Sequence, residues 1–131
     1  YGEDYCAVYS GSRICLNFLR RMSRDRQTSR SIEIPACGGF MLAERTDEHR
    51  RLFAEGQEAE FFSDPPEMLE KIHHYLDHAE ERERIARAGY RRCIEGGYSF
   101  DVRMQEIVEK LDQTDPPDEI DQTVPSLHRP F

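Results

Sequence analysis

The sequence predicts an α/β fold, in which a small parallel sheet of about three strands is flanked by helices and followed by a helical C-terminal part. Three short apolar segments, at 14–18, 40–44 and 58–62, alternate with segments that carry helix-start signals. Each stretch between two of these segments is long enough for the crossover helix that parallel strands require. At 131 residues the chain has the length of one domain, which we expect at 1–111, with a disordered tail at 112–131.

The first strand is expected at 14–18, where residues of alternating polarity lie between polar flanks. A polar loop, RRMSRDRQTSR, follows this strand. Thr28 and Ser29 are good N-cap residues, so a helix is predicted to start there and to carry Glu33 on its second turn. An interior proline, Pro35, predicts that this helix is short or kinked.

The next elements continue the alternation of strand and helix. The second strand is expected at 40–44, where the sequence reads FMLAE. A short helix at 48–53 follows a possible N-cap at Thr46 or Asp47. The third strand is expected at 58–62, where the sequence reads EAEFF.

Three helices are predicted after the third strand. The phrase Asp64-Pro65-Pro66-Glu67 gives the first of them an N-cap carboxylate, a proline at its first position and a glutamate that can reach back to the cap. The second helix is expected at 80–93 and ends at Gly96-Gly97, and the third starts after Ser99. Each has one apolar stripe: Met68, Leu69, Ile72, Tyr75 and Leu76; then Ile85, Ala86, Gly89 and Cys93; then Phe100, Met104, Ile107, Val108 and Leu111.

Net charge and the distribution of apolar residues disfavour some partners and some locations. The formal net charge of −8 disfavours nucleic acid and anionic membranes as partners of the whole chain. No apolar run approaches the roughly 20 residues that cross a bilayer, and the start of the chain lacks the layout of a signal peptide, so the expected location is the cytoplasm.

Cysteine and histidine spacing predicts neither a metal site nor a disulfide scaffold. The cysteines are scattered without a CxxC pair, so we interpret them as small buried residues in a reducing compartment, with Cys37 packed and not reactive. His74 and His78 share a helical face, but no third ligand is evident, and solvated histidines are favoured over a metal site.

The segment around the first strand is locally cationic. Between Tyr5 and Ile32 the only acidic residue is Asp25, against six arginines: Arg13, Arg20, Arg21, Arg24, Arg26 and Arg30. Charge alone favours a solvated surface, and the alternative is a site for an anionic ligand such as a phosphate.

Glu33 and the following glycines also allow two interpretations. A lone helical glutamate is commonly solvated, but one that follows a strand's carboxyl end points toward the crevice where α/β sheets bind ligands, commonly ribose hydroxyls. The expected helix start at Thr28 and Ser29 offers unpaired N–H groups to a diphosphate. Gly38-Gly39 follows a helix, so we interpret it as a left-handed helix end and not as a phosphate-binding loop.

One continuous phrase carries a family resemblance. It is SRSIEIPACGGFMLAERTDEHRRLFAEGQEAEFFSDPPEMLEKIHHYLDHAEERERIARAGYRR, at 29–92, and it resembles the C-terminal half of retaining GT-B glycosyltransferases, especially the group-1-like set that includes spore-maturation-type proteins. The resemblance extends over residues 5–111.

The resemblance implies roles for individual residues. An E-x(7)-E element of the superfamily ends in Glu-Ala-Met-Ala-Cys-Gly, which Glu33-Ile34-Pro35-Ala36-Cys37-Gly38 matches. By resemblance, Glu33 binds the ribose of a nucleotide-sugar donor. The first glutamate of the element falls on Asp25, which is a departure from the family pattern. Charge and position make three arginines candidates for contact with the donor diphosphate: Arg20, Arg24 and Arg30.

The resemblance also implies a partial Rossmann-like domain, truncated at its N-terminus, that binds the donor in an enzyme with two such domains. The reaction implied is retaining transfer of a sugar from a nucleoside diphosphate sugar to an unknown acceptor, without a metal or other cofactor. This chain is then expected to be a fragment that is inactive alone. Its exposed sheet edge is expected to be covered by a second copy, a partner or another domain of a parent chain.

Two alternatives of other classes stay open. The first is a noncatalytic interaction module that keeps the fold without the chemistry. The second, weaker alternative is a response-regulator-like domain, which needs an acidic cluster at strand ends that the sequence lacks before Glu44.

Overall fold

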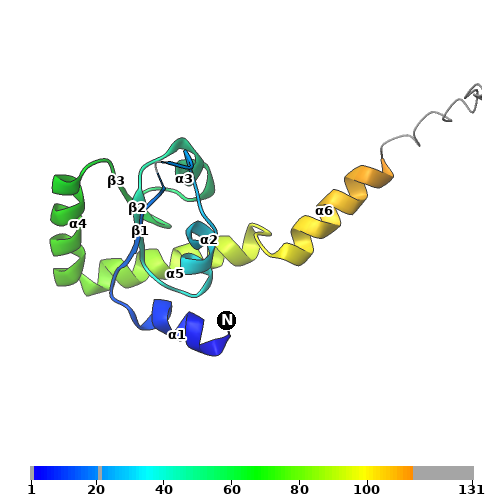
Figure 1. Cartoon of the computed structure of the whole chain (residues 1–131). Coiled ribbons are helices and arrows are strands. Elements are labelled where there is room, and N and C mark those ends of the chain that lie inside the picture. Colours follow the sequence, from blue (N-terminus) through cyan, green and yellow to red (C-terminus); the bar gives the residue numbers. More distant parts are fainter. Residues whose placement is uncertain (1, 21, 114–131) are drawn as a thin grey trace, which may run out of the picture. The chain divides into compact units, whose positions relative to one another are not determined.

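The computed structural model describes residues 2–20 and 22–113, and it confirms the predicted α/β fold with a small parallel sheet flanked by helices (Figure 1). The sheet has three parallel strands in the order β1-β2-β3: β1 (Cys15–Asn17), β2 (Met41–Glu44) and β3 (Glu60–Phe62). Its register sets Leu16 of β1 opposite Leu42 of β2. Each strand is shorter than, and lies within, the segment that the sequence predicts for it.

Helices make up most of the remaining described chain. They are α1 (Glu3–Gly11), α2 (Arg30–Ala36), α3 (Asp47–Leu52), α4 (Pro65–Asp77), α5 (Ala79–Glu95) and α6 (Phe100–Asp112). The chain divides into two units, Tyr1–Ser99 and Phe100–Phe131. The sheet and α1 to α5 belong to the first unit, and α6 belongs to the second. The predicted tail at 112–131 lies almost wholly outside the described residues.

Each face of the sheet carries its own apolar cluster, because successive side chains of a strand point to opposite faces. Helices α2 and α4 lie on opposite sides of the strands (Figure 1). One cluster contains Cys15, Ile34, Met41, Ala43, Phe53, Ala59, Phe61 and Cys93. The other contains Phe40, Leu42, Phe62, Tyr75 and Ile85. Helix α5 contributes to both clusters, through Cys93 in the first and Ile85 in the second.

Two predicted helix caps are confirmed by their hydrogen bonds. The Thr46 hydroxyl accepts the His49 N–H at 3.0 Å and begins α3. The Asp64 carboxylate accepts the Glu67 N–H at 2.8 Å and begins α4. The Glu67 side chain in turn accepts the N–H of Ser63, the residue before the cap, at 2.7 Å.

The predicted left-handed helix end is also confirmed. Gly38 has φ of 77°, and its N–H donates to the Pro35 carbonyl at 2.9 Å, while the Gly39 N–H donates to the Ile34 carbonyl at 3.0 Å. This pair of bonds is a Schellman motif, and Gly38 occupies its left-handed position. At Gly39 an added Cβ would lie 3.1 Å from the Ile34 side chain, so the second glycine lets β2 begin close to α2.

The prediction that the cysteines form no disulfide is wrong for one pair. Cys6 of α1 is joined to Cys37, the C-cap residue of α2, with their Cα atoms 4.9 Å apart. Cys15 and Cys93 are free and buried, as predicted. The pairing depends on α1, a helix that was not predicted from the sequence, which brings together two cysteines separated by 31 positions.

The predicted apolar stripes are only partly buried. In α4, Met68, Ile72 and Tyr75 pack on the sheet, while Leu69 and Leu76 remain 52% and 40% exposed. In α6, described by itself, no residue is buried. No helix among the described residues has the length and apolar character needed to span a membrane.

Gly89 marks the closest approach of α5 to its neighbours. A Cβ added there would lie 2.3 Å from the Glu58 carbonyl oxygen and 3.4 Å from the Pro35 side chain. The glycine therefore allows α5 to lie against the backbone that leads into β3. Because the nearest obstacle is backbone, it cannot move aside as a flexible side chain would.

We predict that Gly89→Ala lowers the free energy of unfolding by about 1–3 kcal/mol, the usual cost of overpacking a tight interior. Denaturant unfolding followed by circular dichroism would measure the change. Gly11→Ala is the matched control, since an added Cβ at Gly11 meets nothing within 4 Å, and it should leave stability unchanged or slightly higher. Equal midpoints for wild type and Gly89→Ala would contradict the close packing of α5 on this backbone.

Candidate functional site

A buried polar network lies where β1 and β2 end. The side-chain amide of Asn17, the last residue of β1, donates to the Ser31 hydroxyl at 3.1 Å. The Thr28 N–H donates to the same hydroxyl oxygen at 3.1 Å, and the Thr28 hydroxyl donates to the Asn17 side-chain oxygen at 3.3 Å. Since Asn17 and Ser31 are fully buried, these bonds fix the end of the loop after β1 onto the sheet.

His49 joins this network from α3. Its Nδ1 lies 2.6 Å from the Glu44 carbonyl oxygen, at the end of β2, so Nδ1 carries the proton. Its Nε2 then accepts the Ser31 hydroxyl proton at 2.7 Å. Burial lowers the pKa of His49, against the opposing effect of the Glu44 carbonyl, and keeps the ring neutral. The ring also stacks on Phe61, with centroids 5.6 Å apart.

The loop between β1 and α2 is held by a second set of contacts. The Thr46 hydroxyl donates to the Arg26 carbonyl at 2.7 Å. The Arg26 guanidinium pairs with Glu48 at 2.8 Å and with Asp47 at 3.5 Å. Arg26 is therefore an anchor of the loop to α3, and its charge is compensated within the chain.

The three arginines predicted for a diphosphate differ from Arg26 in this respect. Arg20, Arg24 and Arg30 are exposed, and none of them forms an ion pair within the described part of the chain. Arg24 has φ of 52°, an uncommon left-handed conformation for a residue with a side chain. The Asp25 N–H donates to the Arg20 carbonyl at 3.3 Å, which closes a tight turn around Arg24. Asp25 itself is half-buried.

The predicted helix start is confirmed, with Ser29 as the N-cap residue of α2, but Thr28 already forms hydrogen bonds within the chain. Helix α2 begins at Arg30, and its N-cap Ser29 is exposed and makes no capping bond with its side chain. The Thr28 N–H and hydroxyl are both used by the buried network. Thr28 thus has a structural role in positioning the loop.

Glu33 lies on α2, half-buried, with its carboxylate directed toward α1. The Tyr5 hydroxyl donates to Glu33 Oε2 at 2.6 Å, and the Tyr9 hydroxyl lies 3.2 Å from that of Tyr5. The structure therefore brings Thr28 into the buried network, and it gives Glu33 a partner on α1 that was not predicted from the sequence.

A second charged cluster, also not predicted from the sequence, lies where β2 and β3 end. Arg45, the residue after β2, contacts Glu55 at 2.6 Å and Glu67 of α4 at 2.6 Å. The Arg45 bond holds the pKa of Glu67 down, to about 2, and the pKa of Glu55 below its usual value. Lys71 contacts Glu67 at 3.2 Å and extends the cluster to Glu60 at 2.8 Å.

This charged cluster borders a cavity of about 380 Å³ at the carboxyl ends of the strands. Residues that follow all three strands line it, and in parallel sheets this edge is where ligands bind. The position of Arg45 directly after a strand was the available sequence signal. The lining residues are Phe18, Glu44, Arg45, Phe62, Ser63, Asp64, Pro65 and Met68.

A family model described as glycosyl transferase-like matches residues 1–109. The chain belongs to this glycosyl transferase-like family. No curated protein and no solved structure matches it significantly.

The match of this glycosyl transferase-like chain covers the whole sheet and α1 to α5. The match therefore includes α1, the helix that was not predicted from the sequence, and the loop after β1. All the residues predicted for donor binding lie in the matched range: Arg20, Arg24, Asp25, Thr28, Ser29, Arg30 and Glu33.

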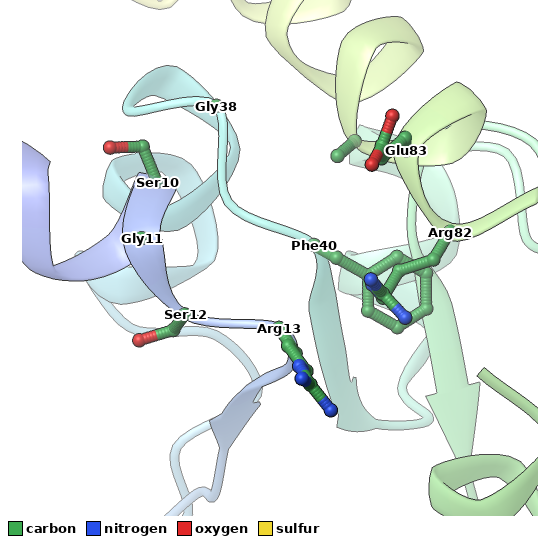
Figure 2. A pocket seen from close by; sticks show the side chains of 9 residues that line it. Ser10, Gly11, Ser12, Arg13, Gly38, Phe40, Arg82 and Glu83 are labelled. Atoms are coloured by element: carbon green, nitrogen blue, oxygen red, sulfur yellow. The ribbon is translucent and has the colours of Figure 1, made fainter. Parts of the chain in front are cut away.

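Two further cavities of this glycosyl transferase-like chain adjoin Gly38, away from the carboxyl ends of the strands. The larger, about 470 Å³, is lined by Gly38, Arg87, Tyr90 and Arg91. The smaller, about 170 Å³, lies where β1 and β2 begin, between the end of α1, the Gly38–Phe40 connection and α5 (Figure 2). Arg82, which borders it, donates to the Tyr75 carbonyl. None of the predicted donor-binding residues lines either of these cavities or the cavity at the carboxyl ends of the strands, so cavity volume does not identify the site.

The lowered pKa of His49 predicts a pH-dependent stability. Below about pH 6.5, the ordinary histidine pKa, the unfolded chain binds a proton that the folded chain excludes. The free energy of unfolding should therefore fall as pH falls, by up to about 1.4 kcal/mol per pH unit, until the folded pKa is reached. Above about pH 7 this contribution should be constant.

Urea unfolding of wild type and His49→Gln between about pH 4.5 and 8 would test this, because the difference between the two isolates His49 from the carboxylates. Gln can still accept from Ser31 but does not titrate. His73→Gln, an exposed histidine on α4, is the matched control and should keep the wild-type slope. A His49→Gln curve parallel to wild type would contradict the burial of a neutral His49.

Proposed function

We propose that this chain is the donor-binding part of a retaining glycosyltransferase of the GT-B type, which transfers a sugar from a nucleoside diphosphate sugar to an acceptor. The family match supports the reaction class. The observation that carries the donor proposal is Glu33, a half-buried carboxylate on the helix that follows the β1 loop, in the position that resemblance gives to the ribose ligand.

In this proposal Glu33 accepts hydrogen bonds from the ribose hydroxyls of the donor. A carboxylate offers about four lone-pair sites, and Tyr5 occupies one of them, on Oε2. The other sites can accept a cis-diol. Asp25, in place of the family's first glutamate, contacts the sugar, with a shorter reach than glutamate has.

The diphosphate is bound in this proposal by the exposed arginines of the β1 loop. Arg20, Arg24 and Arg30 are the cations of this loop and helix start that have no ion-pair partner within the described residues. Guanidinium groups bind phosphate oxygens bidentately. By contrast, Arg26 and Arg45 are already compensated by carboxylates of the chain.

The chemistry assigned to the site is displacement at the anomeric carbon. The bond from that carbon to the β-phosphate oxygen breaks and its electron pair leaves with the diphosphate. The acceptor oxygen bonds to the same carbon with retention, and its proton passes to the departing diphosphate. The arginines stabilise the charge that develops on the departing diphosphate. The acceptor and the residues that activate it are not assigned to this chain.

We predict that Glu33→Ala lowers the affinity for the nucleotide that binds, UDP or GDP, by about tenfold or more. This is the smallest effect expected from the loss of one charge-assisted hydrogen bond. Isothermal titration calorimetry of the chain with both nucleotides and their sugars would measure this. Glu70→Ala, an exposed glutamate on α4, is the matched control and should bind as wild type. Absence of binding to all these ligands would refute the donor proposal and favour a noncatalytic interaction module.

We also predict that Arg24→Gln and Arg30→Gln each weaken binding of the nucleoside diphosphate by about tenfold, because each removes one charge-assisted hydrogen bond to a phosphate oxygen. Binding of the corresponding nucleoside, which has no phosphate, should not change in calorimetric titration. Arg50→Gln, an exposed arginine on α3, is the control for a general reduction of positive charge. Equal weakening for nucleoside and nucleoside diphosphate would show that these arginines do not bind phosphate.

A further inference from the structure

Helix α1 makes two adjacent links to α2. The Tyr5 hydroxyl donates to Glu33 Oε2 at 2.6 Å, and the next residue, Cys6, forms the disulfide with Cys37. The hydrogen bond to the donor-site carboxylate and the covalent link thus start from neighbouring residues of the same helix. The hydrogen bond raises the pKa of Tyr5 above its ordinary value, as expected for a phenol that donates to a carboxylate.

The rest of α1 is held weakly. Tyr5 and Tyr9 are half-buried, but the other side chains of α1 whose burial is described are exposed, and Val8 is 66% exposed. Beyond the links of Tyr5 and Cys6, the Tyr9 side chain packs against the apolar cluster that contains Cys15 and Ile34, and the Cys15 thiol donates to the Tyr9 carbonyl at 3.5 Å. A helix with so little buried apolar surface has a low free energy of local opening. The disulfide therefore contributes much of what keeps Tyr5 beside Glu33.

The disulfide is open to reagents. Cys6 is exposed and Cys37 is half-buried, in contrast to Cys15 and Cys93, which are buried and free. Exposed disulfides are the ones that exchange readily with external thiols.

We propose that Tyr5 is a positioning residue for Glu33, and that the Cys6–Cys37 pair makes donor affinity depend on redox state. This proposal rests on the proposed function and names a regulation of the same site. With the disulfide formed, Tyr5 fixes the Glu33 side chain, whose three torsions would otherwise be free, in one orientation toward the ribose. With the disulfide reduced, α1 opens more often, and Glu33 must be ordered by the donor itself.

The redox step needs an external dithiol as reductant. Its thiolate attacks the exposed Cys6 sulfur, the disulfide bond breaks, and Cys37 leaves as a thiolate that takes up a proton. The second thiol of the reductant then attacks the mixed disulfide and releases Cys6 as a thiol. Two electrons and two protons pass to the protein, and the reductant becomes a cyclic disulfide.

Calorimetric titration with UDP and GDP tests the proposal on four forms of the chain: oxidised wild type, wild type reduced with dithiothreitol, Cys6→Ser/Cys37→Ser, and oxidised Tyr5→Phe. We expect each of the last three forms to bind the nucleotide about three- to tenfold more weakly than oxidised wild type, the effect of removing one hydrogen bond. Tyr90→Phe, an exposed tyrosine on α5, should bind as wild type and controls for removal of a hydroxyl.

A second readout needs no ligand. In chain labelled with ¹³C at tyrosine Cζ, the Tyr5 signal should titrate above the ordinary tyrosine range when the disulfide is present. It should return toward that range in Glu33→Gln and in the reduced chain. If Tyr5 had only a structural role and did not position Glu33, the pH at which Tyr5 titrates would not depend on both Glu33 and the redox state of the disulfide.

The outcomes separate the two proposals. Nucleotide binding that depends on Glu33 but is equal in all four forms overturns the positioning role and leaves the donor proposal standing. Binding that becomes tighter in Tyr5→Phe also overturns it, since Tyr5 would then compete with the donor. Absence of a Cys6–Cys37 peptide in non-reducing mass spectrometry overturns the redox dependence. No nucleotide binding in any form refutes the donor proposal and this one with it.

Discussion

The hydrogen bond between Ser31 of α2 and His49 of α3 joins the helices that follow β1 and β2, and the carboxyl edge of the sheet depends on it. The Ser31 hydroxyl donates to His49 and accepts from Thr28 and Asn17, so all its bonding capacity is used inside the protein. His49 is equally saturated, with the Glu44 carbonyl on its other nitrogen. An unsatisfied buried group in such a network costs about 1–3 kcal/mol, so the network favours a single arrangement of the loop.

In this arrangement some cationic side chains are paired with carboxylates of the chain, whereas others have no ion pair in its described part and are available to a ligand. Arg45 is held by two carboxylates, and Lys71 by the carboxylates of the same cluster. Arg26 anchors its loop to α3. The arginines without an ion pair in the described part of the loop are those that we propose as ligands of the donor diphosphate. The net charge of the chain does not reveal this, because compensated and uncompensated arginines count equally in it.

Much of the fold follows from local signals, which the sequence carries directly. The caps at Thr46 and Asp64, the left-handed glycine at 38 and the three strand segments were all predictable, since each depends on neighbours within a few residues. Helix α1 was not, because its apolar residues form one contiguous run and not a helical stripe, and its stabilising contacts are with residues distant in sequence, such as Glu33 and Cys37. Leu69 and Leu76 are exposed for a similar reason. An apolar stripe indicates which face of a helix packs inward, but not how much of that face the neighbouring elements cover.

The sequence by itself determined the fold class, the order of strands and helices from β1 onward, and the phrase around Glu33 that pointed to a glycosyltransferase family. It did so because hydrophobic period, capping residues and glycine positions act over short distances along the chain. Only the tertiary structure decided which arginines are compensated, that Ser31 and His49 meet, and that Tyr5 and Cys6 of α1 contact Glu33 and Cys37. These contacts join residues 18, 28 and 31 positions apart, and which of many polar groups become partners depends on how the packed elements set them side by side.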